Sequence, residues 1–476
     1  MPAGPRRKNA PSLTHSCLPR TQSTDYLRRM NFLLITADDM NWDAVGAFGC
    51  PVPNVTPNLD RLASQSLRFR HSHVTAAVCQ PSREVLMTGR YPHRNGGMGF
   101  EPIWDHVETL QDRLRDAGYL NGILGKVTHL APVDRFQWDE QQDIGDLGFG
   151  RDPSLYAQYA RRFLERANSE NRPFFLMANA HDPHRPFVGS QQEADRWGDE
   201  VQSIPKPSAF FAPEDVVIPG FLPDLPEIRL EISQYYNSCR RCDDTVGAVL
   251  DVLEKTGHAD NTLVMFLSDN GMAFPFSKTN CYLNSTRTPW IVRWPGVTEA
   301  GRFDEKHFVS GIDFTPTILD IAGLDPIDGI DGSSFADVLR GQGGTERVRV
   351  FTVFHKTSVG NAYPMRGVQE ARYAYIYNAW SDGKTEFKNE SQSGLTFKSM
   401  DAAGAEEPDI QARVDHFRYR TPEELYDFQE DPDALNNLID HPDHQARREA
   451  FRETLMGWMI EKEDPILPDY QSYLST

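Results

Sequence analysis

The sequence predicts an α/β fold in which helices flank a large, mostly parallel sheet, followed by a smaller C-terminal α+β domain with an antiparallel sheet. Two observations predict it. Short continuous apolar runs alternate with helical patterns as far as about residue 345, and shorter strand-like runs with one long helix follow. Apolar runs without polar alternation are typical of strands that are buried on both faces of a parallel sheet.

The strands are clearest at residues 32–35, 122–124, 174–177 and 263–267. Helical spacing of apolar residues predicts helices at 57–66, 109–117, 154–168, 232–255 and 313–322. Strands that alternate with helices in this way indicate an α/β architecture. In the C-terminal part we expect antiparallel strands at 348–354 and 372–377, a polar loop at 378–407 and a helix at 445–462.

The chain has 476 residues, more than one hydrophobic core usually holds, so we expect a large domain at 31–345 and a smaller one at 346–476. Residues 1–30 are basic and lack the apolar centre of a secretory signal. They could be a disordered tail, a transit-type segment or a non-native N-terminal extension with Met30 as the true start. We favour the last, because the first predicted strand begins directly afterwards, at Asn31. The expected location is cytoplasmic.

Charge and cysteine usage exclude several classes of protein. The formal net charge is −19, which argues against binding to nucleic acid or to an anionic membrane. No apolar run of about 18 residues is present to form a membrane-spanning helix. The six cysteines are too scattered for a disulfide framework, and the C-x-x-C of Cys239 and Cys242 falls within a helical pattern that favours a structural role.

Each of the four predicted strands runs directly into polar or ionisable residues. In chain order these are Asp38 and Asp39, Lys126 and His129, His181 and Asp182, and Asp269 and Asn270. In open α/β sheets, ligands bind beyond the carboxyl ends of the strands. The sequence therefore predicts that these residues meet at one rim, in a site for a metal and an anion.

The acids and the amide define the expected metal. Asp38, Asp39, Asp269 and Asn270 offer hard oxygen ligands. Such ligands suit Ca²⁺, or alternatively Mg²⁺, far better than zinc, which prefers histidine and cysteine.

A further motif lies between these strand ends. The pattern C-x-P-S-R followed by T-G-R-x-P is present as Cys79, Pro81, Ser82, Arg83, Thr88, Gly89, Arg90 and Pro92. It resembles the signature of the type I, formylglycine-dependent sulfatases of the alkaline phosphatase superfamily. The resemblance implies a catalytic sulfatase domain, conversion of Cys79 to Cα-formylglycine by a separate formylglycine-generating enzyme, and a bound divalent cation that is usually calcium.

The resemblance continues along most of the chain, at residues 54–63, 125–129 and 424–438. Within the family, residues 181–185, 268–271 and 363–366 look like those of the N-sulfoglucosamine sulfohydrolases, or sulfamidases. One departure is Lys278, where sulfamidases have arginine. The substrate implied is a small sulfated saccharide of glycosaminoglycan type, and the choice between sulfate ester and sulfamate stays open.

The resemblance also implies roles for individual residues. Cys79, once oxidised, is the nucleophile, and Arg83 holds it. Lys126 and Lys278 bind sulfate oxygens, His181 and Lys278 protonate the leaving group, and His129 accepts a proton. His184 and Arg366 are weaker candidates for substrate contacts, and Arg366 could equally form a structural ion pair.

Two other functions remain open. A phosphonate monoester or phosphodiester hydrolase of the same superfamily would share the metal site and can share formylglycine. A non-catalytic, sulfatase-like binding protein would require a damaged site, whereas every expected residue is present.

Overall fold

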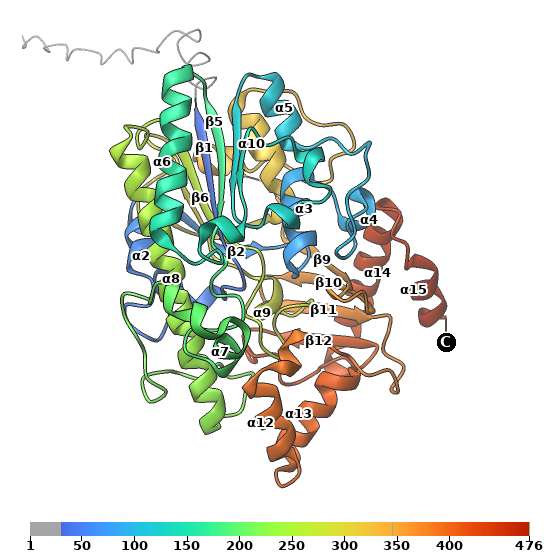
Figure 1. The fold of residues 1–476 in the computed structure, drawn as a ribbon. Coiled ribbons are helices and arrows are strands. Elements are labelled where there is room, and N and C mark those ends of the chain that lie inside the picture. The colour runs from blue at the N-terminus through green and yellow to red at the C-terminus, as the bar shows by residue number, and fades with distance from the viewer. Residues whose placement is uncertain (1–29, 345, 476) are drawn as a thin grey trace, which may run out of the picture.

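The computed structural model describes residues 30–344 and 346–475, and its centre is an eight-stranded sheet (Figure 1). The strands are β1 (Asn31–Ala37), β2 (Leu67–His73), β3 (Leu120–Leu124), β4 (Glu140–Gln142), β5 (Phe174–Asn179), β6 (Thr262–Ser268), β7 (Trp290–Arg293) and β8 (Phe303–Ser310). Their order is β4-β3-β5-β1-β6-β7-β2-β8. Only β7 among them runs antiparallel to its neighbours, so the predicted, mostly parallel sheet is confirmed.

The helices of this part are α2 (Pro57–Ser64), α3 (Cys79–Thr88), α4 (Pro92–Asn95), α5 (Leu110–Asp116), α6 (Pro153–Glu170), α7 (Gln191–Trp197), α8 (Pro226–Lys255), α9 (Leu283–Thr286), α10 (Phe314–Ala322) and α11 (Ala336–Leu339). Local chemistry sets several of their ends. The Asp152 carboxylate caps α6 by accepting from the backbone N–H of Ser154, and α3 ends at Gly89, whose left-handed backbone suits glycine.

Helices cover both faces of the large sheet, as the continuous apolar strands require. In β1, Leu33 and Ile35 face the core shared with α2, α6 and α8. Phe32 and Leu34 face the opposite core, which α5, α10 and α11 complete. Figure 1 shows α6 and α8 on one side of the strands and α5 and α10 on the other.

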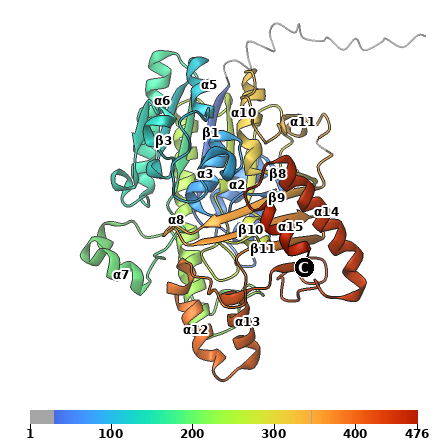
Figure 2. The ribbon, with the colours of Figure 1, turned by 90° about the vertical axis from the view of Figure 1, so that its right-hand side faces the viewer.

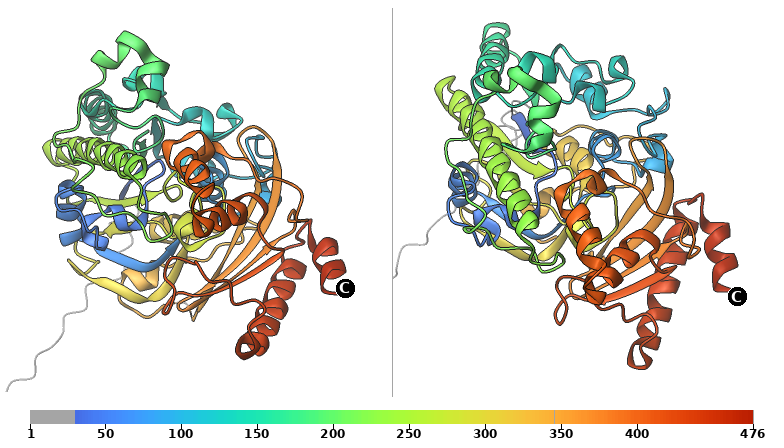
Figure 3. Two further views of the ribbon diagram at one scale, coloured as in Figure 1. Left: turned by 90° about the horizontal axis from the view of Figure 1, so that it is seen from below. Right: turned by 60° about the horizontal axis from the view of Figure 1, so that its bottom comes forward.

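The C-terminal part contains a second, antiparallel sheet in the order β12-β11-β10-β9. Its strands are β9 (Arg349–Lys356), β10 (Ala362–Glu370), β11 (Tyr373–Asn378) and β12 (Glu423–Asp427), and its helices are α12 (Leu395–Gly404), α13 (Pro408–Tyr419), α14 (Gln445–Glu461) and α15 (Leu467–Leu474). Figures 2 and 3 show α14 and α15 on one face of this sheet and α12 and α13 on the other.

The sequence prediction was wrong for residues 378–407, which it treated as a loop. A short 3-10 helix, Glu390–Ser393, and α12 occupy much of this segment. The helix forms because Phe397 and Met400 are buried against α13, a tertiary contact that the polar composition does not reveal.

The predicted division at residue 345 lies just before β9, but the two sheets are not separate in their packing. One buried cluster joins Val85 of α3 and Ile312 to Val353 of β9 and Trp458 of α14. The division into domains 31–345 and 346–476 remains a prediction, and the extension predicted for residues 1–30 lies, except for Met30, outside the described residues.

Two smaller predictions can be compared directly with the structure. Cys239 and Cys242 are buried free cysteines on α8, as expected for a structural C-x-x-C. Among the described residues, no helix has both the length and the apolar character to cross a bilayer.

Candidate active site

The order of the central strands explains why the predicted residues meet. β3, β5, β1 and β6 are consecutive neighbours in the sheet and run parallel, so their carboxyl ends lie side by side at one edge. Asp38 and Asp39 follow β1, and Asp269 and Asn270 follow β6. The structure thus brings together the acids from two strand ends that the sequence predicted at one rim.

The acidic side chains form a compact cluster that fits a divalent cation. Oxygen atoms of Asp38, Asp39 and Asp269 lie within 4.8 Å of one another, and all three residues are fully buried. Asn270 donates from Nδ2 to Asp39 Oδ1 at 2.7 Å, whereas its own buried Oδ1 has no hydrogen-bond partner. Three carboxylates and a free amide oxygen are a suitable ligand set for Ca²⁺ or Mg²⁺.

Electrostatics within the cluster lead to the same conclusion. Burial, with a further contribution from neighbouring carboxylates, raises the pKa of Asp39 well above its ordinary value and that of Asp269 to about 6. Burial also acts to raise the pKa of Asp38, but the Lys126 ammonium and the other nearby cations outweigh it and hold that pKa low. Carboxylates crowded in this way are stabilised by a bound cation.

Cys79 lies at the first position of α3, beside the acids. Its Sγ donates a hydrogen bond to Asp38 Oδ1 at 3.4 Å. Burial raises the pKa of the thiol well above its ordinary value, so the unmodified residue is a protonated thiol and a weak nucleophile. Position 79 therefore lies beside the acid cluster, where the motif predicts the nucleophile.

Arg83, one turn further along α3, connects the nucleophile helix to the acids. Its guanidinium lies 2.6 Å from Asp269 and 3.7 Å from Asp38, and it also donates to Asn179 at 2.7 Å. The side chain is fully buried. Arg83 therefore offsets part of the negative charge and fixes the orientation of α3.

Two lysines face the same cluster from different loops. Lys126 forms an ion pair with Asp38, and the Lys278 ammonium lies 2.8 Å from Asp39 Oδ1. Gly125 and Lys126 both have left-handed backbone, and a Cβ at Gly125 would lie 2.4 Å from the Asn179 carbonyl oxygen. Glycine is therefore required at the turn that directs Lys126 into the site.

Three histidines lie around this centre, on the side that is partly open to solvent. His181 Nδ1 is 4.0 Å from Asp38 Oδ2, and its ring stacks on that of His184 at 4.8 Å. Burial and nearby cations lower the pKa of His184 to about 3 and that of His129 to about 2. Burial likewise lowers the pKa of His181 well below its ordinary value, so all three imidazoles are neutral in the folded protein.

Arg366 is not part of this cluster. It lies on β10, is fully buried, and pairs with Asp464 through contacts of 2.6 and 2.9 Å. The sequence analysis left a substrate contact and a structural ion pair equally open, and the structure supports the ion pair.

Glu390 was missed by the sequence analysis. One of its carboxyl oxygens lies 2.6 Å from the Lys278 ammonium and within 4.8 Å of ligand atoms of Asp39 and His184. It belongs to the polar segment predicted as a loop, and nothing in the local sequence marks it as a site residue.

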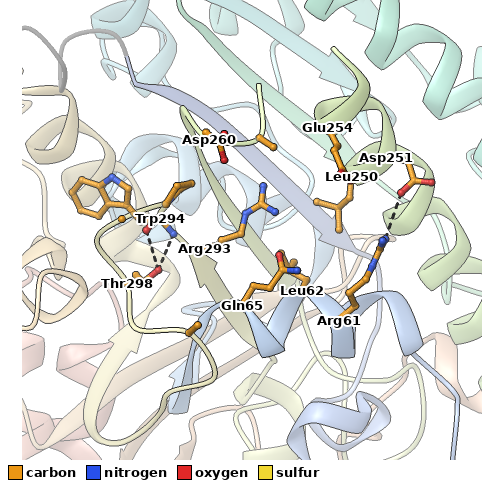
Figure 4. Close-up of a pocket in the computed structure, with 14 residues that line it drawn as sticks. Arg61, Leu62, Gln65, Leu250, Asp251, Glu254, Asp260, Arg293, Trp294 and Thr298 are labelled. Atoms are coloured by element: carbon orange, nitrogen blue, oxygen red, sulfur yellow. Dashed lines mark hydrogen bonds and ion pairs between the residues drawn. The ribbon is translucent and has the colours of Figure 1, made fainter. Parts of the chain in front are cut away.

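A separate pocket of about 400 Å³ lies at the opposite end of the large sheet (Figure 4). Arg293, at the end of β7, lines this pocket and is paired with Val264, near the start of β6. The pocket therefore lies at the amino end of β6, whereas the acid cluster lies at its carboxyl end. Arg61 and Asp251 form an ion pair of 3.5 Å at its edge. The pocket shares no lining residue with the cluster at the strand ends.

The fold, the buried acid cluster and the position of Cys79 together define a sulfatase, and comparisons with known proteins support this assignment. The family model described as Sulfatase matches residues 30–324, so this chain belongs to the sulfatase family. A second model, described as N-sulphoglucosamine sulphohydrolase, C-terminal, matches residues 272–390.

Several relatives span most of the chain. The N-sulphoglucosamine sulphohydrolase of Homo sapiens is 33% identical over 472 residues, covering 92% of this chain and 91% of the relative. An ulvan-active sulfatase of Formosa agariphila is 26% identical and covers 90% and 75%.

Solved structures share the fold. A protein in complex with its substrate D-glucosamine-2-N,6-O-disulfate matches with a TM-score of 0.70 at 19% identity, over 93% of this chain and 99% of that one. The phosphonate monoester hydrolase of Agrobacterium radiobacter matches with a TM-score of 0.66 at 20% identity, over 91% and 96%.

Proposed function

We propose that this protein hydrolyses a sulfate ester or a sulfamate on a small sulfated saccharide of glycosaminoglycan type. The single observation that carries the proposal is the buried cluster of Asp38, Asp39, Asp269 and Asn270 beside Cys79. Lysines on two further loops supply the positive charge that a sulfate group needs. Similarity to the human N-sulphoglucosamine sulphohydrolase supports the class of substrate.

Two groups would complete the site. Asp38, Asp39, Asp269 and Asn270 would hold the cation, for which we propose Ca²⁺ because the cluster is rich in carboxylates. A formylglycine-generating enzyme would convert Cys79, because this residue begins the sulfatase motif Cys79, Pro81, Ser82 and Arg83 and the chain belongs to the sulfatase family. Bound together, the cation and the hydrated formylglycine supply charge neutralisation and a hydroxyl nucleophile.

The chain's own residues bind and orient the sulfate. Lys126 and Lys278 are almost fully buried, so their ammonium groups act in a site from which water is largely excluded. Charge interactions are much stronger there than in bulk water. Arg83, which is fixed beside Asp269, adds a third buried cation next to the acids and would hold the modified residue at position 79.

Proton transfer falls to groups at the open side. His181 Nδ1 is buried without a hydrogen-bond partner, and so is His129 Nδ1. A neutral imidazole with a free ring nitrogen can accept a proton, and the Lys278 ammonium can donate one to the departing oxygen or nitrogen. Lys278 would thus protonate the leaving group, the remaining N–H of the neutral His181 would donate a hydrogen bond to that group, and His129 would accept the proton released at position 79.

The test combines a substrate panel with a chemical assay of residue 79. Protein produced with a formylglycine-generating enzyme would be assayed on N-sulfoglucosamine, glucosamine 6-sulfate, an aryl sulfate and an aryl phosphonate, with Cys79→Ala as the control. We expect turnover of at least one sulfated sugar, none by the control, and formylglycine at position 79 by peptide mass spectrometry. A large preference for the phosphonate would reject the sulfatase function in favour of the alternative hydrolase.

A further inference from the structure

The substrate-facing side of the site contains a segment from the C-terminal part of the chain, residues 389–396. At its start, Asn389 Nδ2 donates to Thr279 Oγ1 at 2.6 Å, next to Lys278 in the sequence. The Asn389 side chain also caps the short helix that begins at Glu390. These contacts hold Glu390 against Lys278, with 2.6 Å between the carboxyl oxygen and the ammonium.

The other end of the 389–396 segment is held just as firmly. Glu231 of α8 accepts hydrogen bonds from the backbone N–H groups of Leu395 and Thr396, at 2.9 and 2.7 Å. The same carboxylate pairs with Arg185, which directly follows His184. Glu390 is therefore fixed between two loops that carry site residues and is ordered before any substrate arrives.

The exposure of Glu390 differs from that of the charges behind it. Its side chain is 31% exposed, whereas that of Lys278 is 3% exposed and that of Asp39 is fully buried. The Lys278 ammonium lies between the two carboxylates, so the position between Glu390 and Asp39 already holds a positive charge. The exposed part of Glu390 is thus free to contact a substrate at the mouth of the site rather than a second metal ion.

We propose that Glu390 is a specificity-determining residue, whose carboxylate accepts hydrogen bonds from hydroxyl or amino hydrogens of the sugar that carries the scissile sulfate. This inference rests on the proposed function and adds the substrate feature that is recognised. An ionised carboxylate only accepts hydrogen bonds, and bonds to charged groups are stronger than neutral ones. It also repels anions, so it disfavours sugars with a second sulfate or a carboxylate beside the scissile group.

The experiment measures kcat/KM of Glu390→Gln and Glu390→Ala on a monosulfated glucosamine, on its disulfated counterpart and on an aryl sulfate. Glu406→Gln, on a residue exposed to solvent after α12, is the matched control. We expect the monosulfated sugar to lose about 10-fold with glutamine and up to about 100-fold with alanine, the range for a hydrogen bond to a charged group. The aryl sulfate has no sugar hydroxyls, so it loses only what the ion pair between Glu390 and Lys278 contributes, and its kcat/KM should fall by much less than that of the sugar. Glutamine should also raise the ratio of disulfated to monosulfated turnover.

The outcomes separate this inference from the proposed function. An equal loss of kcat/KM on the sugar and on the aryl sulfate would show that Glu390 acts through Lys278 instead. No loss on the sugar would show that Glu390 does not contact it. Either result overturns the inference but leaves the sulfatase function intact. Failure of the unmutated enzyme on every sulfated sugar would reject the proposed substrate class and the Glu390 contact with it. Thermal midpoints of all variants identify any that are misfolded.

Discussion

The ion pair between Arg366 and Asp464 provides a sharp test, because the same arginine was a candidate for substrate binding. Both side chains are fully buried, and two N–H groups of the guanidinium contact the carboxylate at 2.6 and 2.9 Å. The guanidinium also donates to the carbonyl of Met365 at 2.8 Å. The perturbation is Asp464→Asn, compared with Arg366→Met and with the double variant.

The structure sets the size of the effect. Asp464→Asn leaves a buried guanidinium without a counter-ion, which typically costs about 3–5 kcal/mol. Arg366→Met leaves a carboxylate that still accepts from the backbone N–H of Ile466 at 3.0 Å and can take up a proton. We therefore expect Asp464→Asn to be the more damaging single change, and the double variant to recover part of the loss because no unpaired charge remains.

The assay is chemical denaturation of the three variants beside measurements of kcat/KM at a temperature where all are folded. We expect large losses in the free energy of unfolding and little change in kcat/KM. An exposed ion pair contributes at most about 1 kcal/mol to the free energy of unfolding. A loss smaller than this for Asp464→Asn would refute the argument that burial makes this ion pair important for stability. If Arg366→Met instead raised KM without changing the free energy of unfolding, the result would support the alternative interpretation, in which Arg366 contacts the substrate.

Three further predictions concern the site and its surroundings. A ligand that binds the native state stabilises it, so Ca²⁺ should raise the thermal midpoint of chelator-treated protein, and by more than Mg²⁺ does. Asn270→Ala should remove most of this shift. Scanning calorimetry measures it, and an equal shift in the variant would argue against the assigned ligands. Glu84 is buried and burial raises its pKa to about 9 from 4.5, so the folded protein binds the extra proton and stability falls as pH rises between these values. The free energy of unfolding of Glu84→Gln should therefore rise relative to that of the unmutated protein by up to about 1.4 kcal/mol per pH unit in that window. Chemical denaturation at several pH values measures this difference. A difference that does not change with pH would contradict the raised pKa of Glu84. Arg83→Met should leave the buried Asp269 without its ion pair, so we expect a loss of about 3 kcal/mol or more of stability together with loss of turnover. A stable, active variant would show that Arg83 has no such role.

Much of this protein could be predicted from local sequence. The strands β1, β3, β5 and β6 were found within a few residues of their observed ends, since continuous apolar runs and the polar residues that follow them are local signals. The acids Asp38, Asp39 and Asp269 and the amide Asn270 could be placed at one rim because parallel strands end on the same side of a sheet. The motif around Cys79 predicted the nucleophile without any knowledge of its surroundings, and the structure places this residue beside the acids.

The limits of that prediction fall where contacts join distant parts of the chain. Glu390 lies in a polar stretch, and its place beside Lys278 depends on Asn389, Thr279 and the packing of α12, none of which has a recognisable local pattern. Strand order is a similar case, because only the folded sheet makes β3, β5, β1 and β6 consecutive neighbours.

The sequence by itself thus determined the class of fold and predicted the metal ligands and the nucleophile, because those inferences depend on residue type and short-range spacing. Only the tertiary structure decided that Arg366 belongs to a buried ion pair and that Glu390 belongs to the site, because each assignment depends on which partner the fold brings within a few ångströms. Chain topology supplies those partners, and it is set by the sum of many long-range contacts rather than by any one segment.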